Sequence, residues 1–253
     1  MHRDYGSQAR IGILPPQANP TVEPEIGLLL PSGVSMLVNR LVSQGEPRQR
    51  FLDYFRKLQT TLQGFDTMDL DVAGFACTAS SYLLDEGEEE RSCSALQQQF
   101  GYPVITAATA ILQALQFLGT KRIALGCPYP AWLLEHAEAF WSKQGFEIAA
   151  SFSAQPKMGD TRAIYKVTAR EATQLIGDAF AGVSCDAIVI TGTGMPALQV
   201  ICALQDKFGV PVFNSNLALA WACLRATRAS LKDRAPEAGF PLLGGWQDQL
   251  HRL

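Results

Sequence analysis

The chain has 253 residues, of which 47% are hydrophobic and 18% charged, and its formal net charge is -3 at pH 7. This size allows a large buried core in one or two domains, while the scattered Lys and Arg residues leave no basic patch for nucleic acid or a membrane surface. No apolar run reaches the length of a membrane span or of a secretory signal, so we expect a cytoplasmic protein with a small-molecule partner.

Eight short apolar runs, bounded by Gly, Pro and polar residues, alternate with longer helical patterns along the chain. This alternation is typical of parallel sheets whose strands are joined by crossover helices. In chain order the predicted strands are Ile11–Leu14, Met36–Asn39, Val72–Ala76, Val104–Thr106, Ile123–Gly126, Glu147–Ala150, Ala187–Thr191 and Val210–Phe213. The sequence therefore predicts an α/β fold.

The second half of the chain repeats the first. Ala95–Val104, with the sequence ALQQQFGYPV, is echoed by Ala203–Val212, ALQDKFGVPV, and an Ala- and Leu-rich helical pattern follows each copy. Upstream of the two copies, the strand and turn Asp71–Thr78 match Asp186–Thr193. A repeat of this kind predicts two similar lobes, each a parallel sheet flanked by helices and related to the other by pseudo-twofold symmetry.

The repeat also predicts where the lobes divide and where a site would lie. We expect a first lobe of residues 1–113 plus 216–253 and a second lobe of residues 114–215. The alignment makes Cys77 of the first lobe and Gly192 of the second lobe counterparts. Ligands of open parallel sheets bind beyond the carboxyl ends of the strands, where both residues fall, so we expect the site between the lobes.

Cys77 is the predicted reactive group. It ends an apolar strand and begins the turn Cys77–Ser81, where Thr78, Ser80 and Ser81 can cap backbone N–H groups. A thiol at a helix N-terminus is expected to have a lowered pKa, and the same backbone amides can hold a carboxylate or an enolate oxygen. The alternative is that Cys77 only packs at the strand end, since free cysteines are commonly buried.

Other turns at the predicted strand ends supply candidate binding groups. Asn19 could hydrogen-bond a carboxylate, although Asn before Pro is also an ordinary turn residue. Tyr129, between two prolines, could direct its hydroxyl at an anion or could only pack. Thr78 and Thr193, at matching positions, could donate to an oxyanion or cap helices. The full set of predicted substrate-binding residues is Pro16, Asn19, Thr78, Ala79, Tyr129, Gly192 and Thr193.

The cysteines and histidines form no pattern for a metal or a cofactor. The six cysteines lie far apart without a CxxC pair, and three histidines are too few for a His-based metal site or a Ser-His-Asp triad. The glycines of Thr191–Met195 match neither the GxGxxG pattern nor the P-loop pattern. We therefore expect neither a metal nor an organic cofactor.

These residues resemble the aspartate/glutamate racemase superfamily, and within it the branch of arylmalonate decarboxylase and maleate cis-trans isomerase. The resemblance runs from about Arg10 to about Arg225, and its markers are Pro15–Glu25, Cys77–Ser81, Cys127–Tyr129 and Phe208–Val212. It implies two lobes, no cofactor, a small carboxylate or dicarboxylate substrate and up to two cysteines that face the α-carbon of the substrate. A homo-oligomer is the assembly that the resemblance suggests.

Within this resemblance, Cys77 matches the first cysteine and Gly192 takes the place of the second. A two-base racemase needs a proton-transfer group on each face of the carbon, so we do not expect amino-acid racemisation. The leading activity that the resemblance implies is a decarboxylation. In that reaction Thr78, Tyr129 and turn amides hold an enediolate, and Cys77 delivers the proton to it.

Two alternatives stay open. The first turn carries Asn19, Thr21 and Glu23, which resemble the isomerase form of that turn. In an isomerase, Cys77 would add to the double bond of a substrate such as maleate, permit rotation and leave, and Arg162 would replace a family asparagine as a carboxylate contact. The second alternative is a carboxylate-binding protein that keeps the cleft and has lost the chemistry, which a glycine in place of the second cysteine favours.

Overall fold

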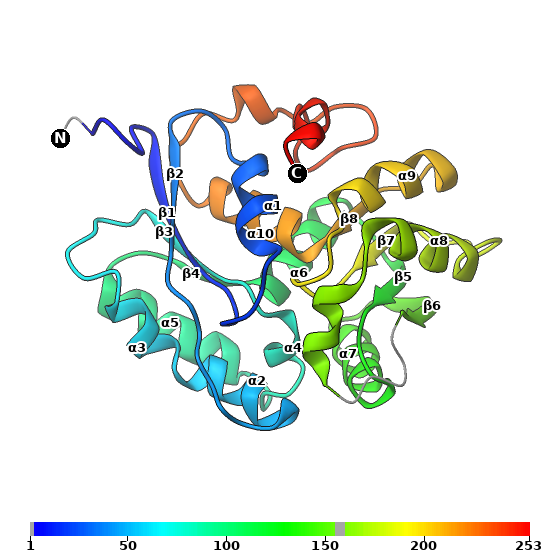
Figure 1. The fold of residues 1–253 in the computed structure, drawn as a ribbon, viewed down its shortest axis with the longest axis horizontal. Coiled ribbons are helices and arrows are strands. Elements are labelled where there is room, and N and C mark those ends of the chain that lie inside the picture. The colour runs from blue at the N-terminus through cyan, green and yellow to red at the C-terminus, as the bar shows by residue number, and fades with distance from the viewer. Residues whose placement is uncertain (1–2, 155–159) are drawn as a thin grey trace.

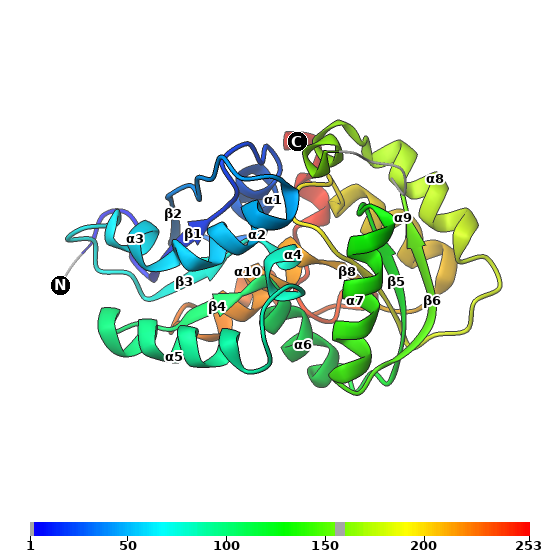
Figure 2. The same cartoon turned by 90° about the horizontal axis from the view of Figure 1, so that it is seen from below.

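The computed structural model describes residues 3–154 and 160–253, which form two four-stranded parallel sheets with helices packed on their faces (Figures 1 and 2). The first sheet has the order β2-β1-β3-β4 and the second the order β6-β5-β7-β8, so the two halves share one topology. The strands are β1 (Ala9–Leu14), β2 (Val34–Val38), β3 (Val72–Phe75), β4 (Val104–Thr106), β5 (Arg122–Cys127), β6 (Glu147–Ser153), β7 (Ala187–Ile190) and β8 (Val212–Asn214). The predicted fold of two similar α/β lobes is confirmed.

All the predicted strands occur, with ends displaced by at most three residues. The central strands β3 and β7 are buried along their whole length, and their sequences, VAGF and AIVI, lack the polar alternation of a half-exposed strand. Continuous apolar strands are expected where helices cover both faces of a parallel sheet. Short apolar runs between turn residues were therefore sufficient to locate the strands.

Helices connect the strands of each sheet. In chain order they are α1 (Val22–Leu29), α2 (Pro47–Arg56), α3 (Leu58–Gln63), α4 (Thr78–Ser81), α5 (Glu88–Phe100), α6 (Ala107–Phe117), α7 (Ala131–Lys143), α8 (Ala169–Ala179), α9 (Leu198–Phe208) and α10 (Ser215–Arg225). Short 3-10 helices occupy Thr161–Lys166, Lys232–Arg234 and Gln247–Arg252.

The repeated Phe-Gly-x-Pro-Val sequence marks the same junction in each half. Gly101 (φ 79°) ends α5 and Gly209 (φ 67°) ends α9, both in the left-handed conformation that commonly terminates helices. The chain then enters β4 or β8, and Thr106 and Asn214 cap α6 and α10 by accepting a backbone N–H. The sequence repeat therefore corresponds to a repeated helix–strand–helix unit.

Helix α10 joins the two halves. Ten of its eleven residues are buried, and it contacts β3 and β4 of the first sheet, β8 of the second sheet and the helices α1 and α6. Figures 1 and 2 both show α1 and α10 between the sheets. The predicted lobe boundaries, 113/114 and 215/216, fall inside α6 and at the start of α10, and they stay a prediction.

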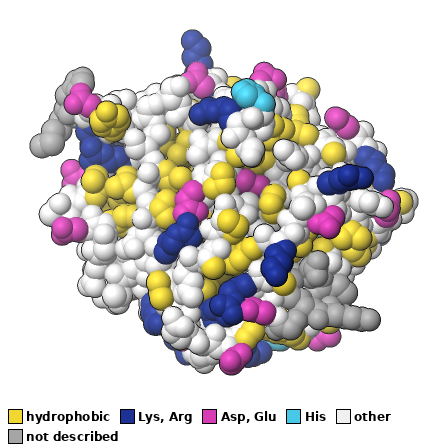
Figure 3. All heavy atoms as spheres, viewed as in Figure 1, with side chains coloured by type: hydrophobic (Ala, Val, Ile, Leu, Met, Phe, Trp, Pro, Cys, Tyr) yellow, Lys and Arg dark blue, Asp and Glu magenta, His cyan; other side chains and the backbone are white. Residues whose placement is uncertain are grey.

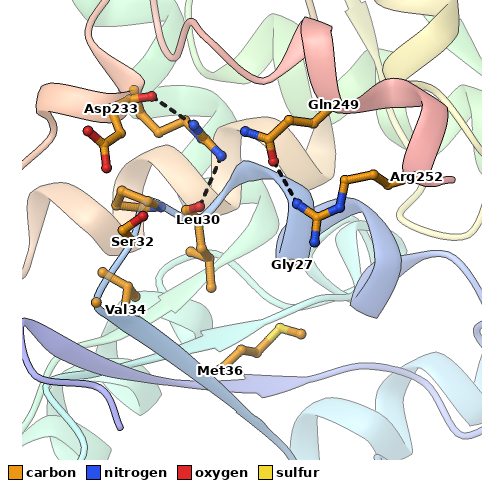
Figure 4. Close-up of a pocket in the computed structure, with 11 residues that line it drawn as sticks. Gly27, Leu30, Ser32, Val34, Met36, Asp233, Gln249 and Arg252 are labelled. Carbon is orange, nitrogen blue, oxygen red and sulfur yellow. Dashed lines mark hydrogen bonds between the residues drawn. The ribbon is translucent and has the colours of Figure 1, made fainter. Parts of the chain in front are cut away.

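The C-terminal segment packs across the end of α1. Buried Arg234 donates from Nε and Nη2 to the carbonyl oxygens of residues 28–30, where α1 has no basic side chain of its own. The last carbonyls of a helix have no partner inside the helix, so Arg234 satisfies them from outside. An open hollow lies beside this contact, and on its rim Arg252 donates a hydrogen bond to Gln249 (Figure 4).

The outer surface mixes charge types. On the face that Figure 3 shows, acidic and basic side chains are interspersed with each other and with apolar side chains. Across residues 3–154 and 160–253, no helix is both long enough and apolar enough to cross a lipid bilayer.

Candidate active site

The predicted site residues converge on one cavity between the two sheets. The turns that follow β1, β3, β5 and β7 meet there, at the carboxyl ends of their strands. The cavity is lined by Cys77, by the predicted binding residues Pro16, Asn19, Thr78, Ala79, Tyr129, Gly192 and Thr193, and by Arg50, Phe51, Tyr54, Thr161, Arg162, Ile164, Tyr165 and Gly194. The roles of these residues toward a substrate stay predictions.

Cys77 lies between β3 and α4 and is 3% exposed. Burial raises the pKa of its thiol, while the Ser80 hydroxyl, the backbone amides of Ser80 and Ala79 and the charge of Arg50 act in the opposite direction. The predicted lowering of this pKa is wrong. Helix α4 has only four residues, and desolvation of a fully buried thiolate outweighs the few donors around it.

The predicted capping of α4 by its hydroxyl side chains is also wrong. No side chain caps this helix. Thr78 Oγ1 instead donates to Ser215 Oγ at 2.9 Å, and Ser80 Oγ lies 2.7 Å from the carbonyl oxygen of Phe51 and 3.2 Å from Cys77 Sγ. Ser81 Oγ is buried without a hydrogen-bond partner among the described residues. The hydroxyls therefore attach α4 to its neighbours and leave its backbone amides to the thiol.

Asn19 and Thr193 connect the turn that follows β1 in the first lobe to the turn that follows β7 in the second lobe. Asn19 Oδ1 accepts the backbone N–H groups of Thr21 and Val22, and its Nδ2 donates to Thr193 Oγ1 at 3.1 Å. Thr193 Oγ1 in turn donates to the carbonyl oxygen of Ala76 at 2.8 Å. The Thr193 hydroxyl proton is thus committed within the protein, whereas one N–H of Asn19 is left for a ligand.

Glu25 fixes the same region and was not singled out from the sequence. Its Oε1 accepts the backbone N–H groups of Ala197 and Leu198 at the start of α9, and its Oε2 accepts from Asn214 and Asn216. Burial raises the pKa of the Glu25 carboxyl, and these four donors oppose that effect. The sequence signal was weak, because an acidic residue in the first turn of a helix is usually exposed.

Gly192 adopts a φ of 88°, a conformation that side chains of L-residues rarely adopt. A Cβ built at this position would lie 2.9 Å from Pro128 Cγ. At Gly194, a Cβ would lie 2.5 Å from Cε1 of Tyr165, so the glycine lets this ring close one wall of the cavity. The backbone conformation of this turn therefore favours glycine at position 192, where the family has its second cysteine.

Tyr129 presents an unpaired polar atom. The residue is 5% exposed, and its hydroxyl has no hydrogen-bond partner among the described residues. Its ring packs edge-on against Tyr82, with centroids 6.1 Å apart, and burial raises the pKa of its hydroxyl well above the usual value. Thr191 and Tyr82 are the polar neighbours that affect this hydroxyl, but neither makes a hydrogen bond of good geometry with it. Buried hydroxyls without such a partner are uncommon, which makes Tyr129 a candidate donor.

Arg50 and Arg162 share the carboxylate of Asp160. Arg162 donates to both oxygens of that carboxylate, and Arg50 Nη2 donates to Oδ1 at 3.0 Å. The Arg162 hydrogen bonds hold the pKa of Asp160 well below its usual range. The guanidinium of Arg162, which was predicted to contact a substrate carboxylate, is thus already paired with Asp160. The start of its loop, residues 158 and 159, lies outside the described residues.

Arg50 was missed from the sequence. It lies on α2, whose buried residues Arg50, Phe51, Tyr54 and Phe55 form one helical face. That spacing could have indicated that an arginine shares the apolar face, but nothing local indicated that this face lines the site. Among the described residues, no group of three or more His, Cys, Asp or Glu side chains could hold a metal ion.

Two parallel-sheet lobes of one topology meet at a cavity that has a cysteine at a strand end, which is the architecture expected for the aspartate/glutamate racemase superfamily. A family model described as arylmalonate decarboxylase matches residues 11–240. The chain belongs to the arylmalonate decarboxylase family, whose enzymes act on carboxylates as isomerases or decarboxylases.

Named relatives represent both activities. The chain is 26% identical to a maleate isomerase of Geobacillus stearothermophilus over 249 residues, 93% of this chain and 97% of the relative. It is 29% identical to the arylmalonate decarboxylase of Bordetella bronchiseptica over 143 residues, 55% of this chain and 58% of the relative. A solved structure of Nocardia farcinica maleate cis-trans isomerase, a cysteine-to-serine variant with a covalently bound succinylcysteine intermediate, matches with a TM-score of 0.76 and 23% identity, covering 86% of this chain and 92% of that chain.

Proposed function

We propose that this protein catalyses the cis–trans isomerisation of a small unsaturated dicarboxylate of the maleate type, with Cys77 as the nucleophile. The observation that carries the proposal is the position of Cys77, the one cysteine among the described residues that lines the cavity and the match to the first cysteine of the family.

The relatives support the same choice. The maleate isomerase aligns over nearly its whole length, whereas the decarboxylase aligns over little more than half of its length. The isomerase that carries succinylcysteine is an example of a covalent cysteine adduct on this fold. These comparisons favour isomerisation over the decarboxylation that the sequence placed first.

The chemistry needs one thiol. The Cys77 sulfur adds to one carbon of the double bond, and the electron pair moves into the carboxylate on the other carbon to give an enediolate. The former double bond is now single and rotates. Return of the electron pair re-forms the double bond and expels the Cys77 thiolate, so all atoms and electrons balance. Because no second thiol takes part, Gly192 is compatible with this reaction.

The groups around the cavity match the charges that this reaction develops. The Ser80 hydroxyl and the backbone amides of Ala79 and Ser80 interact with the Cys77 sulfur and would stabilise its thiolate. The unpaired Tyr129 hydroxyl is available to donate to the enediolate. The protein thus offers donors for both the attacking sulfur and the developing oxyanion.

Decarboxylation is the second candidate, and one observation favours it. Burial raises the pKa of the Cys77 thiol, which favours its protonated form. A decarboxylase uses that proton: loss of CO₂ leaves an enediolate, and the thiol delivers a proton to its carbon. An isomerase must first ionise the thiol.

The experiment offers the protein maleate and, separately, phenylmalonate, and measures fumarate and CO₂ from pH 6 to pH 10, a range of about four units chosen to span ordinary thiol ionisation. Isomerisation is expected to rise with pH through the raised pKa of Cys77, since the thiolate is the reactive form. A decarboxylation that falls over the same range, without fumarate formation, would replace the proposal with the second candidate.

The Cys77→Ala variant is the control for both reactions. We expect it to lose fumarate formation while it still binds a dicarboxylate. No turnover of either substrate by the wild-type protein, together with full binding by Cys77→Ala, would instead favour a carboxylate-binding protein.

A further inference from the structure

Arg50 is a buried cation on the wall of the cavity that contains Cys77. It comes from α2 of the first lobe, it is 5% exposed, and its Nη2 donates to Asp160 Oδ1 at 3.0 Å and to Thr161 Oγ1 at 2.9 Å in the second lobe. The next residue, Phe51, contributes the carbonyl oxygen that lies beside Ser80 Oγ. Arg50 is therefore fixed across the two lobes, close to the group that contacts the thiol.

Most hydrogen-bonding capacity of this guanidinium is unused. Its hydrogen bonds to described residues are all made by Nη2, which leaves Nε and Nη1 without a partner among those residues. A guanidinium has five N–H donors in a planar fork that matches a carboxylate. Arg50 is 5% exposed and lines the cavity, so a ligand that carries oxygen atoms is the natural partner for these donors.

The local charge favours an anion. The carboxylate of Asp160 is the acceptor for both Arg50 and Arg162, so two guanidinium groups share one negative charge. No Asp or Glu belongs to the described residues that line the cavity. This part of the cavity therefore carries a net positive charge that a carboxylate would neutralise.

We infer that Arg50 binds one carboxylate of the substrate and thereby selects dicarboxylates over monocarboxylates. The inference rests on the proposed function and names a residue that the sequence did not indicate. The second carboxylate lies toward the Tyr129 hydroxyl, and the double bond lies between the two ends, beside the Cys77 sulfur. Arg50 is thus a specificity-determining residue for the isomerase reaction.

Arg50 also bears on the choice between the two reactions. Departure of CO₂ removes negative charge from the leaving carboxylate, so a guanidinium that stabilises this charge would oppose decarboxylation. Addition of a thiolate to a double bond keeps both carboxylates and places more negative charge on one of them. A guanidinium on a carboxylate therefore assists isomerisation.

The test measures binding without chemistry. Calorimetry compares succinate, which has two carboxylates and no double bond, with propionate, which has one. Wild-type protein is expected to bind succinate more tightly, and Arg50→Met to lose about tenfold or more in succinate affinity, so that the preference over propionate disappears. Arg48→Met, an exposed arginine on the same helix, is expected to behave as wild type. If Arg50→Met prefers succinate to propionate as strongly as the wild-type protein does, the inference is overturned.

A second variant covers a failure to fold. If circular dichroism shows that Arg50→Met is unfolded, Arg50→Lys takes its place in the test. Lysine keeps the charge but lacks the planar fork of a guanidinium, so a severalfold weaker preference for succinate is expected. An unchanged preference in Arg50→Lys would then count against the inference. If succinate binding depends on Arg50 but the protein forms no fumarate, the role of Arg50 is supported and isomerisation is rejected. If the protein forms fumarate but succinate binding does not depend on Arg50, isomerisation is supported and the role of Arg50 is rejected.

Discussion

Ser80 stands at the centre of the thiol environment. Its hydroxyl has one proton and two acceptors within reach, the carbonyl oxygen of Phe51 at 2.7 Å and Cys77 Sγ at 3.2 Å. Beside a neutral thiol, the shorter bond to Phe51 is favoured. Ionisation of Cys77 draws the proton toward sulfur, because a hydrogen bond to a charged acceptor is stronger. Ionising this thiol therefore costs a hydrogen bond elsewhere.

The first prediction follows from this exchange. Ser80→Ala removes a donor to the thiolate, so the pKa of Cys77 should rise further, and alkylation by iodoacetamide below that pKa should slow by about tenfold. Peptide mass spectrometry of Cys77 across pH gives the profile. Ser81→Ala is the matched control, since Ser81 Oγ has no partner among the described residues. Equal profiles for both variants would contradict the role of Ser80.

The second prediction concerns Gly192. Gly192→Ala should lower the free energy of unfolding by about 1–3 kcal/mol, since it forces a side chain into a positive φ against Pro128. Urea denaturation gives the value. Gly126→Ala in β5 is the control, because its new Cβ would meet Ile176 at 3.4 Å, an ordinary contact. A cost at Gly192 no larger than at Gly126 would show that the turn is not constrained.

The environments of single residues were the hardest feature to predict from the sequence. Cys77 was found because it ends an apolar strand, which is local information, but the direction of its pKa shift depends on burial by elements far away in the sequence. Arg50 contacts Thr161, 111 positions later, and its local sequence is that of an ordinary charged helix. The sequence thus indicated Cys77 and Arg162 among the residues that line the cavity and missed Arg50.

At the scale of elements, the sequence was most informative where structure is set locally. The strands followed from apolar runs, and the repeated Phe-Gly-x-Pro-Val sequence corresponds to the ends of α5 and α9, where Gly101 and Gly209 adopt the left-handed conformation. The C-terminal end of α1 is different, because its carbonyls are satisfied by Arg234, more than 200 positions away. No pattern within α1 could indicate that partner.

The third prediction tests that cap. Arg234→Met should destabilise the protein by about 1–3 kcal/mol, since it leaves buried carbonyl oxygens at the end of α1 without donors. Thermal or urea unfolding measures the loss. Arg252→Met, on the rim of the same hollow, removes only an exposed hydrogen bond to Gln249 and should cost about 0.5 kcal/mol or less (Figure 4). Equal losses would contradict the capping role of Arg234.

At the scale of the whole molecule, the two lobes are joined by buried polar contacts as well as by packing. Asn19 reaches Thr193, Thr21 reaches Gly194, and Glu25 caps the start of α9. Helix α10 adds apolar contacts with both sheets. Each lobe therefore relies on the other for hydrogen-bond partners of its buried polar groups near the site.

The fourth prediction is that both lobes unfold as one unit. Native-state hydrogen exchange should give β3 and β7, the buried central strands of the two sheets, the same free energy of opening, equal to that of global unfolding. Coincident urea transitions by fluorescence and circular dichroism would agree with this result. A markedly lower value for one of the two strands would mean that its lobe opens independently.

The conformation of Gly192 limits how this chain can change over evolution. A single substitution can place a thiol in this turn, but its Cβ would take a positive φ and lie 2.9 Å from Pro128 Cγ. Any side chain gained here therefore starts with a stability cost that a shift of the Pro128 turn would have to relieve. A chain with stability to spare could accept such a change, whereas a marginally stable one could not.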